Sequence, residues 1–252
     1  EGVLPDGVVV VEGDRIVLVA PWEAARTSAW AARVDGLGAT DDTLVPGLID
    51  LHCHGGGGAS FPDAPDVATA AVAAREHLRA GTTSLVASLV TASPETLLER
   101  TAVLADLADA GEIVGIHLEG PFLSAARCGA QDPDLMQAPD VGLVREVARV
   151  ARGHLVTMTV APEVPGVAGS GGVADALVDV GALPSFGHTD AAAGEMRAAI
   201  EESFARLAAD GVRSRRPTVT HLFNGMRPVA HREAGPIPDC LPHRQPPIPE
   251  SP

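Results

Sequence analysis

The sequence predicts an α/β fold in which about six strand-helix units form an incomplete (β/α)8 barrel after a small N-terminal β element. The first observation is a set of short apolar runs, which are typical of parallel strands covered by helices on both faces. The second is that helical segments separate these runs. The third is that 46% of the 252 residues are apolar, enough for a large core. The strand-like runs occupy residues 45–54, 82–91, 113–122, 154–163, 183–190 and 217–223.

The helices between these strands are indicated by residues that commonly begin or end a helix. Ser93 can cap a helix that Gly111 ends, and Asp190 can cap another that runs to Gly211. A third helix is expected near 66–80. Six alternating units point to a closed-barrel architecture, whose active site is formed at the C-terminal ends of the strands.

Three regions are expected along the chain. Region 1–44 begins with a hairpin over 7–19, where two β-branched runs flank a glycine turn. Region 45–235 is the barrel portion, and 236–252 is an irregular, proline-rich tail that lacks an apolar period. Two of eight strands are unaccounted for and the first residue is not methionine, so we expect a chain shortened at the C-terminus and also at the N-terminus.

Charge and composition exclude several classes of function. Eighteen basic and 33 acidic residues give a net charge of −15, which opposes binding to nucleic acid or to an anionic membrane through bulk charge. All basic residues are arginine, so Schiff-base lysines, ATP-binding P-loops and carboxylated-lysine metal bridges are excluded. Three cysteines without metal-finger spacing, and no apolar run long enough to span a membrane, predict a cytoplasmic protein.

Five polar side chains at strand ends form a candidate metal site. His52 and His54 lie two residues apart on one strand and therefore face the same side. Two polar residues at a strand end would also explain this pair. Glu119, His188 and His221 each end a different strand-like run, at the edge where barrel active sites form. Imidazole and carboxylate ligands suit zinc, iron, manganese or cobalt, so the set predicts metal-dependent hydrolysis of an amide or ester.

Four motifs together resemble the N-acetylglucosamine-6-phosphate deacetylases of the amidohydrolase superfamily. They are PGLIDLHCHG (46–55), GIHLEGPFLS (115–124), GHTDA (187–191) and THLFNGMRP (220–228). The resemblance implies a distorted (β/α)8 barrel beside a small β-sandwich, of which 1–44 would be an incomplete portion. It also implies a homodimer that converts N-acetylglucosamine 6-phosphate and water to glucosamine 6-phosphate and acetate.

The resemblance assigns metal ligands by position. Glu119, His188 and His221 match the principal ligands of a divalent ion such as zinc or iron. His52 and His54 match a pair that can hold a second ion in the members that possess it. One or two ions per chain are therefore expected.

The resemblance also assigns substrate contacts. Ala130 and Gln131 match a loop that touches substrate, although many members have histidine where Gln131 stands. Asn224 and Gly225 match contacts to the sugar, and Arg232 matches the arginine that binds phosphate. Arg232 suits this role because an acidic chain needs a local, permanently charged fork for a phosphate.

The departure from the family concerns the catalytic acid-base group. The family uses an aspartate on a later strand, no residue of this sequence matches it, and we do not assign that role to Asp239. We therefore expect impaired turnover. Two alternatives remain open: another amidohydrolase that acts on a different amide, and a catalytically inactive relic.

Three other residues near the motifs receive secondary interpretations. His117 shares a strand face with Glu119 and could orient a ligand. Cys53 points away from the flanking histidines and is expected to pack, and His77 on a helix is expected to be solvated or structural.

Overall fold

The computed structural model describes residues 2–38, 40–210 and 213–241, in two compact units, Glu1–Pro46 and Gly47–Pro252. In the first unit, antiparallel strands β1 (Gly7–Glu12) and β2 (Arg15–Pro21) form the predicted hairpin. Two short helices follow, α1 (Trp22–Ala25) and α2 (Ala31–Val34). Their side chains close a small core that consists of Val8, Val10, Ala25 and Val34.

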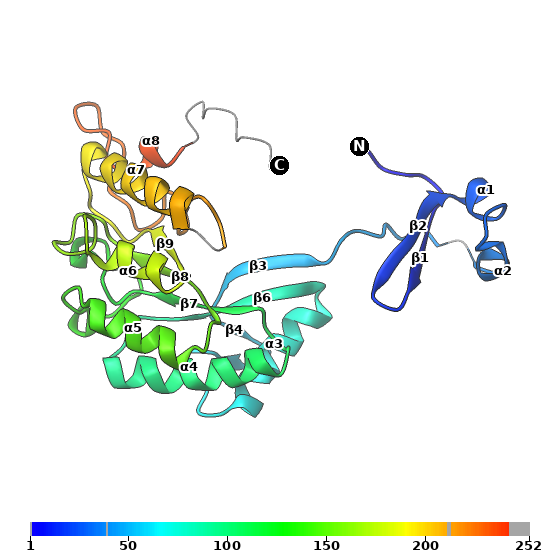
Figure 1. Ribbon diagram of the computed structural model, residues 1–252, viewed down its shortest axis with the longest axis horizontal. Coiled ribbons are helices and arrows are strands. Elements are labelled where there is room, and N and C mark those ends of the chain that lie inside the picture. The colour runs from blue at the N-terminus through cyan, green and yellow to red at the C-terminus, as the bar shows by residue number, and fades with distance from the viewer. Residues whose placement is uncertain (1, 39, 211–212, 242–252) are drawn as a thin grey trace. The chain divides into compact units, whose positions relative to one another are not determined.

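The second unit is built on a curled, six-stranded parallel sheet that forms a half-barrel (Figure 1). All six predicted strands are present, and the strand order is β10-β9-β8-β7-β6-β3. The expectation of an incomplete barrel is therefore confirmed. The bounds are β3 (Leu48–Cys53), β6 (Thr82–Leu89), β7 (Gly115–Glu119), β8 (Leu155–Val160), β9 (Leu183–Phe186) and β10 (Thr218–Val219).

The helices of this unit lie along the outer side of the sheet (Figure 1). Asp66 and Ser93 cap the first two, by accepting hydrogen bonds from the N–H groups of Thr69 and Thr96, and the Ser93 cap is the one that the sequence predicted. The α-helices are α3 (Val67–Arg79), α4 (Pro94–Asp109), α5 (Val141–Val150), α6 (Val173–Asp179), α7 (Ala193–Asp210) and α8 (Ile237–Cys240). Two 3-10 helices are η1 (Ala125–Arg127) and η2 (Pro133–Leu135).

The expected cap of α7 is wrong. The helix begins at Ala193, and the Asp190 carboxylate is held by the guanidinium groups of Arg127 and Arg227, each at 2.7 Å. Two charge-assisted hydrogen bonds are stronger than one bond to a neutral backbone N–H, so they fix this carboxylate outside the helix.

The core lies between the sheet and its helices. Every residue of β7 is buried, and the largest fully buried side chains include Phe61, Phe122 and Phe186. The edge strand β3 differs, because Leu48, Ile49 and Leu51 stay 56–69% exposed. A short ribbon, β4 (Gly55–Gly56) and β5 (Ala59–Ser60), follows β3. This ribbon requires glycine at 55, where φ is +150° and a Cβ would lie 2.3 Å from the Ala59 carbonyl oxygen.

The C-terminal tail is described only in part. Helix α8 lies within the expected irregular region, and residues 242–252 lie outside the described residues. Across the described ranges, the helices lack the combined length and apolar character of a membrane span.

Candidate metal centre

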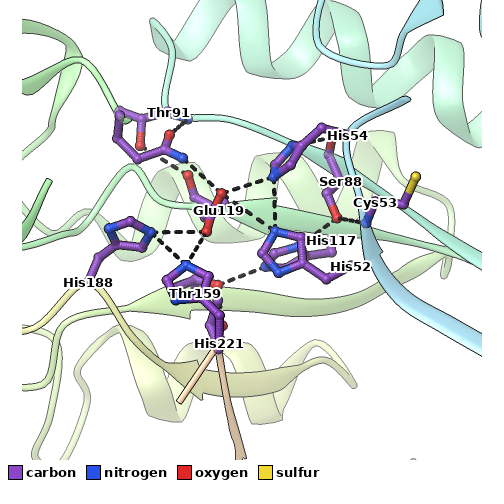
Figure 2. A network of polar contacts seen from close by, with 12 residues as sticks. His52, Cys53, His54, Ser88, Thr91, His117, Glu119, Thr159, His188 and His221 are labelled. Carbon is purple, nitrogen blue, oxygen red and sulfur yellow. Dashed lines mark hydrogen bonds and ion pairs between the residues drawn. The ribbon is translucent and has the colours of Figure 1, made fainter. Parts of the chain in front are cut away.

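The five predicted metal ligands converge on one point at the C-terminal edge of the sheet (Figure 2). His52 belongs to the end of β3 and His54 follows it, and Glu119 ends β7. His188 and His221 lie in the loops after β9 and β10. Because all these strands are parallel, their C-terminal ends face the same side and bring together residues up to 169 positions apart (His52 to His221).

Glu119 lies at the centre and uses one carboxylate oxygen for each pair of histidines. Oε1 is 3.0 Å from His188 Nε2 and 2.9 Å from His221 Nε2. Oε2 is 3.1 Å from His54 Nε2 and 3.5 Å from His52 Nε2. The ligands therefore form two groups of three that share this carboxylate.

The other ring nitrogens fix the tautomers of three histidines. Nδ1 of His188 lies 2.8 Å from the Arg127 carbonyl oxygen, and Nδ1 of His221 lies 2.9 Å from that of Asn224. Nδ1 of His54 is 3.2 Å from the Ser88 carbonyl oxygen. A carbonyl oxygen can only accept, so each Nδ1 donates a hydrogen. In a neutral ring, each Nε2 then presents a lone pair toward Glu119, which is the tautomer that binds metal ions.

The distances between the ligand atoms indicate whether the residues fit a metal ion. The Nε2 atoms of His188 and His221 lie 3.0 Å apart, and those of His52 and His54 lie 2.9 Å apart. Lone pairs and a carboxylate at these distances repel one another unless protons or a cation lie among them. Within each group the ligand atoms lie within 4.8 Å of one another, and nitrogen and oxygen donors suit zinc or iron. The site therefore fits one or two divalent ions.

Burial and hydrogen bonds shift the pKa values of Glu119, His221 and the neighbouring His117. Burial raises the pKa of Glu119, but contacts with His188, His221 and the other two histidines outweigh burial and hold the pKa far below its usual range. The hydrogen bond to Glu119 raises the pKa of His221. Burial lowers the pKa of His117 to about 3, so its ring is neutral at pH 7.

Neutral His117 belongs to a buried polar network below the ligands. Its Nδ1 is 2.9 Å from Ser88 Oγ, and its Nε2 is 2.7 Å from Thr159 Oγ1. Thr159 in turn shares a 2.6 Å hydrogen bond with Thr220. The His117 ring packs edge-on against His52, with centroids 4.6 Å apart. It supports this ligand by packing, whereas the sequence had suggested an orienting role without specifying a contact.

Gln131, predicted to contact substrate, is buried beside the metal ligands. Its Nε2 donates to Glu119 Oε2 at 2.8 Å, and its Oε1 accepts from the Thr91 N–H at 2.8 Å. Thr91 also donates through its hydroxyl to the Glu119 carbonyl oxygen. Sequence reasoning missed this contact, since the loop conformation that turns Gln131 inward has no local signal.

The other predicted substrate residues differ in their contacts with the cluster. Gly225 lies against it, because a Cβ at this position would be 3.2 Å from His188 Nδ1. The Asn224 carbonyl accepts from His221, while its side chain and Ala130 are exposed. Arg232 is exposed and pairs with no residue in the described ranges.

A charged network that the sequence did not single out holds the His188 loop. Glu163 accepts from the Thr189 hydroxyl at 2.5 Å and from the Asp190 N–H at 2.6 Å. Asp190 pairs with Arg127, whose carbonyl accepts from His188. The backbone at His188 has φ +47°, a left-handed conformation that costs about 1–3 kcal/mol, and these contacts offset that cost.

A curled parallel sheet with histidine and carboxylate ligands at its C-terminal edge is typical of metal-dependent hydrolases. The chain belongs to the amidohydrolase family, whose sequence profile matches residues 43–212.

Proteins similar to this chain are amino-sugar-phosphate deacetylases. An N-acetylglucosamine-6-phosphate deacetylase of Bacillus subtilis is 33% identical over 211 residues, covering 81% of this chain and 49% of the relative. An N-acetylgalactosamine-6-phosphate deacetylase of Shewanella sp. is 31% identical over 83% of this chain and 49% of the relative. The crystal structure of N-acetyl-D-glucosamine-6-phosphate deacetylase from Mycobacterium smegmatis aligns with a TM-score of 0.72 and 38% identity, covering 92% of this chain and 56% of that one. The chain thus spans about half the length of the curated relatives it matches.

Glu119→Gln tests the shared carboxylate. The substitution keeps the shape but removes the charge that both ligand groups share and replaces one of the two ligand oxygens with an amide nitrogen, so zinc affinity should fall by more than the roughly 10–100-fold typical of losing a supporting residue. Calorimetric titration with Zn²⁺ measures the effect. Glu112→Gln, which alters an ion pair with Arg75, is the matched control and should leave affinity unchanged. Equal zinc binding by both variants would refute the assignment.

Gln131→Ala tests the support of Glu119. Loss of the amide donor frees Oε2 to rotate, so the dissociation constant for Zn²⁺ should rise by about 10–100-fold. Gln137→Ala removes a similar amide that donates only to the Leu135 carbonyl, and should have no effect on zinc binding. If Gln131→Ala binds zinc as tightly as Gln137→Ala, the contact has no role at the centre.

Proposed function

We propose that this chain provides the metal-binding half of a deacetylase that hydrolyses the N-acetyl amide of N-acetylglucosamine 6-phosphate to glucosamine 6-phosphate and acetate. The observation that carries the proposal is the pair of ligand groups that share Glu119 at the edge of the half-barrel. The similarity to deacetylases of amino-sugar phosphates supports the substrate class. This class includes both the gluco and the galacto epimer among the relatives.

Zinc, iron or a similar divalent ion is the proposed cofactor, with one or two ions per chain. Glu119, His188 and His221 would hold one ion, and His52 and His54 would hold a second with the other oxygen of Glu119. Such an ion, when bound, polarises an amide carbonyl and activates water. The backbone carbonyls that accept from Nδ1 keep the rings oriented, so that in a neutral ring the Nε2 lone pair faces the site.

The substrate contacts that we propose belong to three loop segments. Gly225 allows close approach beside His188, and Asn224 adjoins it with an exposed amide. Exposed Ala130 is the proposed contact in the other loop, where Gln131 acts mainly by holding Glu119. Arg232 is the proposed phosphate ligand, because a guanidinium fork matches phosphate oxygens.

The carboxylates that hold the centre and its loops are not free to transfer a proton to the leaving amine. Glu119 is engaged by histidines, Asp190 by two arginines, and Glu163 by Thr189 and the Asp190 N–H. Asp239 is buried and paired with Arg197 of α7 at 2.7 Å, so it is unsuited to the role.

Little or no deacetylation is therefore expected from these 252 residues even when they are loaded with zinc. General acid-base catalysis contributes about 10²–10⁴-fold, so acetate release should be slower by a similar factor than for the full-length Bacillus subtilis relative assayed in parallel. Enzymatic detection of acetate measures this rate. Acetate release at the rate of the relative would overturn the inference that this chain lacks the acid-base group.

Arg232→Ala tests the phosphate site in a binding assay that does not need turnover. Loss of a charged hydrogen bond of about 1.5–3 kcal/mol should weaken binding of N-acetylglucosamine 6-phosphate by about 10–150-fold. Binding of N-acetylglucosamine itself should not change. Exposed Arg216 supplies the matched control, Arg216→Ala. Equal weakening for both sugars would remove the phosphate role.

Two alternatives predict different results in the same assays. An amidohydrolase for another amide would bind zinc but would not prefer the phosphorylated sugar. An inactive relic would bind metal and neither sugar. A homodimer and a cytoplasmic location are further parts of the proposal, the first from the resemblance and the second from three free cysteines.

A further inference from the structure

A second cluster of mixed donors lies outside the metal centre, where β3 meets α3. Cys53 Sγ, a ring nitrogen of His77 and a carboxylate oxygen of Asp50 all lie within 4.8 Å of one another. Sγ and Nε2 are 3.0 Å apart. The Gly55 carbonyl oxygen is 3.0 Å from this Nε2 and 3.5 Å from Sγ, so it adds a fourth donor to the cluster.

Irregular backbone brings these donors together. The register of β3 against β6 shifts between Asp50 and Cys53, which allows side chains three residues apart to meet. His77 reaches the cluster from the last turn of α3. Glycine at position 56 lets the imidazole approach the backbone closely, because a Cβ there would lie 2.9 Å from His77 Nε2. Three segments, β3, the β4-β5 ribbon and α3, thus contribute to one cluster.

The cluster is separate from the proposed catalytic centre. Figure 2 shows the Cys53 sulfur pointing away from Glu119, whereas the rings of His52 and His54 point toward it. The donor chemistry also differs, because the catalytic ligands offer only nitrogen and oxygen. Cys53 is 8% exposed, and both His77 and Asp50 are half-buried.

We propose that Asp50, Cys53 and His77, together with the Gly55 carbonyl, bind a thiophilic divalent cation such as Zn²⁺. Sulfur, nitrogen and oxygen donors in a set of four match the tetrahedral preference of zinc. Binding replaces the thiol proton of Cys53, so that Cys–SH and Zn²⁺ give Cys–S⁻–Zn²⁺ and H⁺ leaves to solvent. The His77 ring takes its other neutral tautomer, with the hydrogen that Nε2 donates to the Gly55 carbonyl moved to Nδ1, which frees the Nε2 lone pair for the ion. The bound ion connects β3, the β4-β5 ribbon and α3.

This cation has a structural role that bears on the catalytic histidines. His52 and His54 flank Cys53, and the Asp50 carboxylate accepts from the His52 N–H at 3.1 Å. Fixing Cys53 to α3 therefore fixes the backbone that carries both histidines. Without the ion, the thiol and imidazole can still hydrogen-bond to the Gly55 carbonyl, so the test must detect a metal–sulfur bond itself.

Titration of the full chain with Co²⁺ detects that bond, because thiolate coordination gives a near-ultraviolet sulfur-to-cobalt charge-transfer band that nitrogen and oxygen ligands do not give. The wild type should show the band. Cys53→Ser and His77→Asn should abolish it, while Glu119→Gln, which impairs only the catalytic centre, should retain it. Total Zn²⁺ bound should fall by one equivalent in His77→Asn.

Cys128→Ser is the matched cysteine control. Its loop lies near the catalytic centre, since a Cβ on the adjacent Gly129 would be 3.1 Å from His188 Cε1. This variant should keep the band. A wild type without the band overturns the proposal, as does a band that is lost in Cys128→Ser and kept in His77→Asn. Because the wild-type spectrum alone can refute the site, the result does not depend on the folding of Cys53→Ser.

Discussion

The site depends on one buried carboxylate that faces four imidazole nitrogens. Glu119 is 3% exposed, so its charge is removed from water and must be balanced by the groups around it. Backbone carbonyls hold the Nδ1 hydrogens of His188, His221 and His54, which turns their Nε2 lone pairs toward the carboxylate. Positive charge has to lie among these atoms, and a divalent cation would supply it while leaving the tautomers unchanged. Strand order, loop conformation and the buried polar network all help to hold the four histidines around Glu119.

The fold meets the requirement by combining regular strands with strained loops. Parallel strands bring the ends of β3 and β7 to one edge, where His52, His54 and Glu119 need only the alternation of a strand to face inward. His188 and His221 instead lie on left-handed backbone, with φ of +47° and +31°. Ion pairs of Asp190 and the bonds of Glu163 hold the first of these loops. Gly225 packs closely against the imidazole rings of His188 and His221, and leaves little room for a side chain at this position.

Much of this arrangement could be predicted from sequence because it follows from local periodicity. The six strands appear as apolar runs, and the five candidate ligands follow from their positions at strand ends. Contacts that depend on distant partners could not be predicted. Aspartate is a common helix-capping residue, but Arg127 and Arg227, which are 63 and 37 residues from Asp190 in the sequence, hold its carboxylate away from the helix. Gln131 turns inward through a loop without periodicity, and the pairing of Cys53 with His77 depends on a register shift that no residue pattern announces.

The central claim is that Glu119 bridges histidines through a bound cation, and anomalous X-ray diffraction from crystals grown with Zn²⁺ tests it most directly. Data recorded on both sides of the zinc absorption edge locate each ion without reference to activity. The account predicts a peak about 2.0–2.2 Å from Glu119 Oε1 and from the Nε2 atoms of His188 and His221. No anomalous density beside Glu119, with direct hydrogen bonds from protonated histidines to its carboxylate, would contradict it.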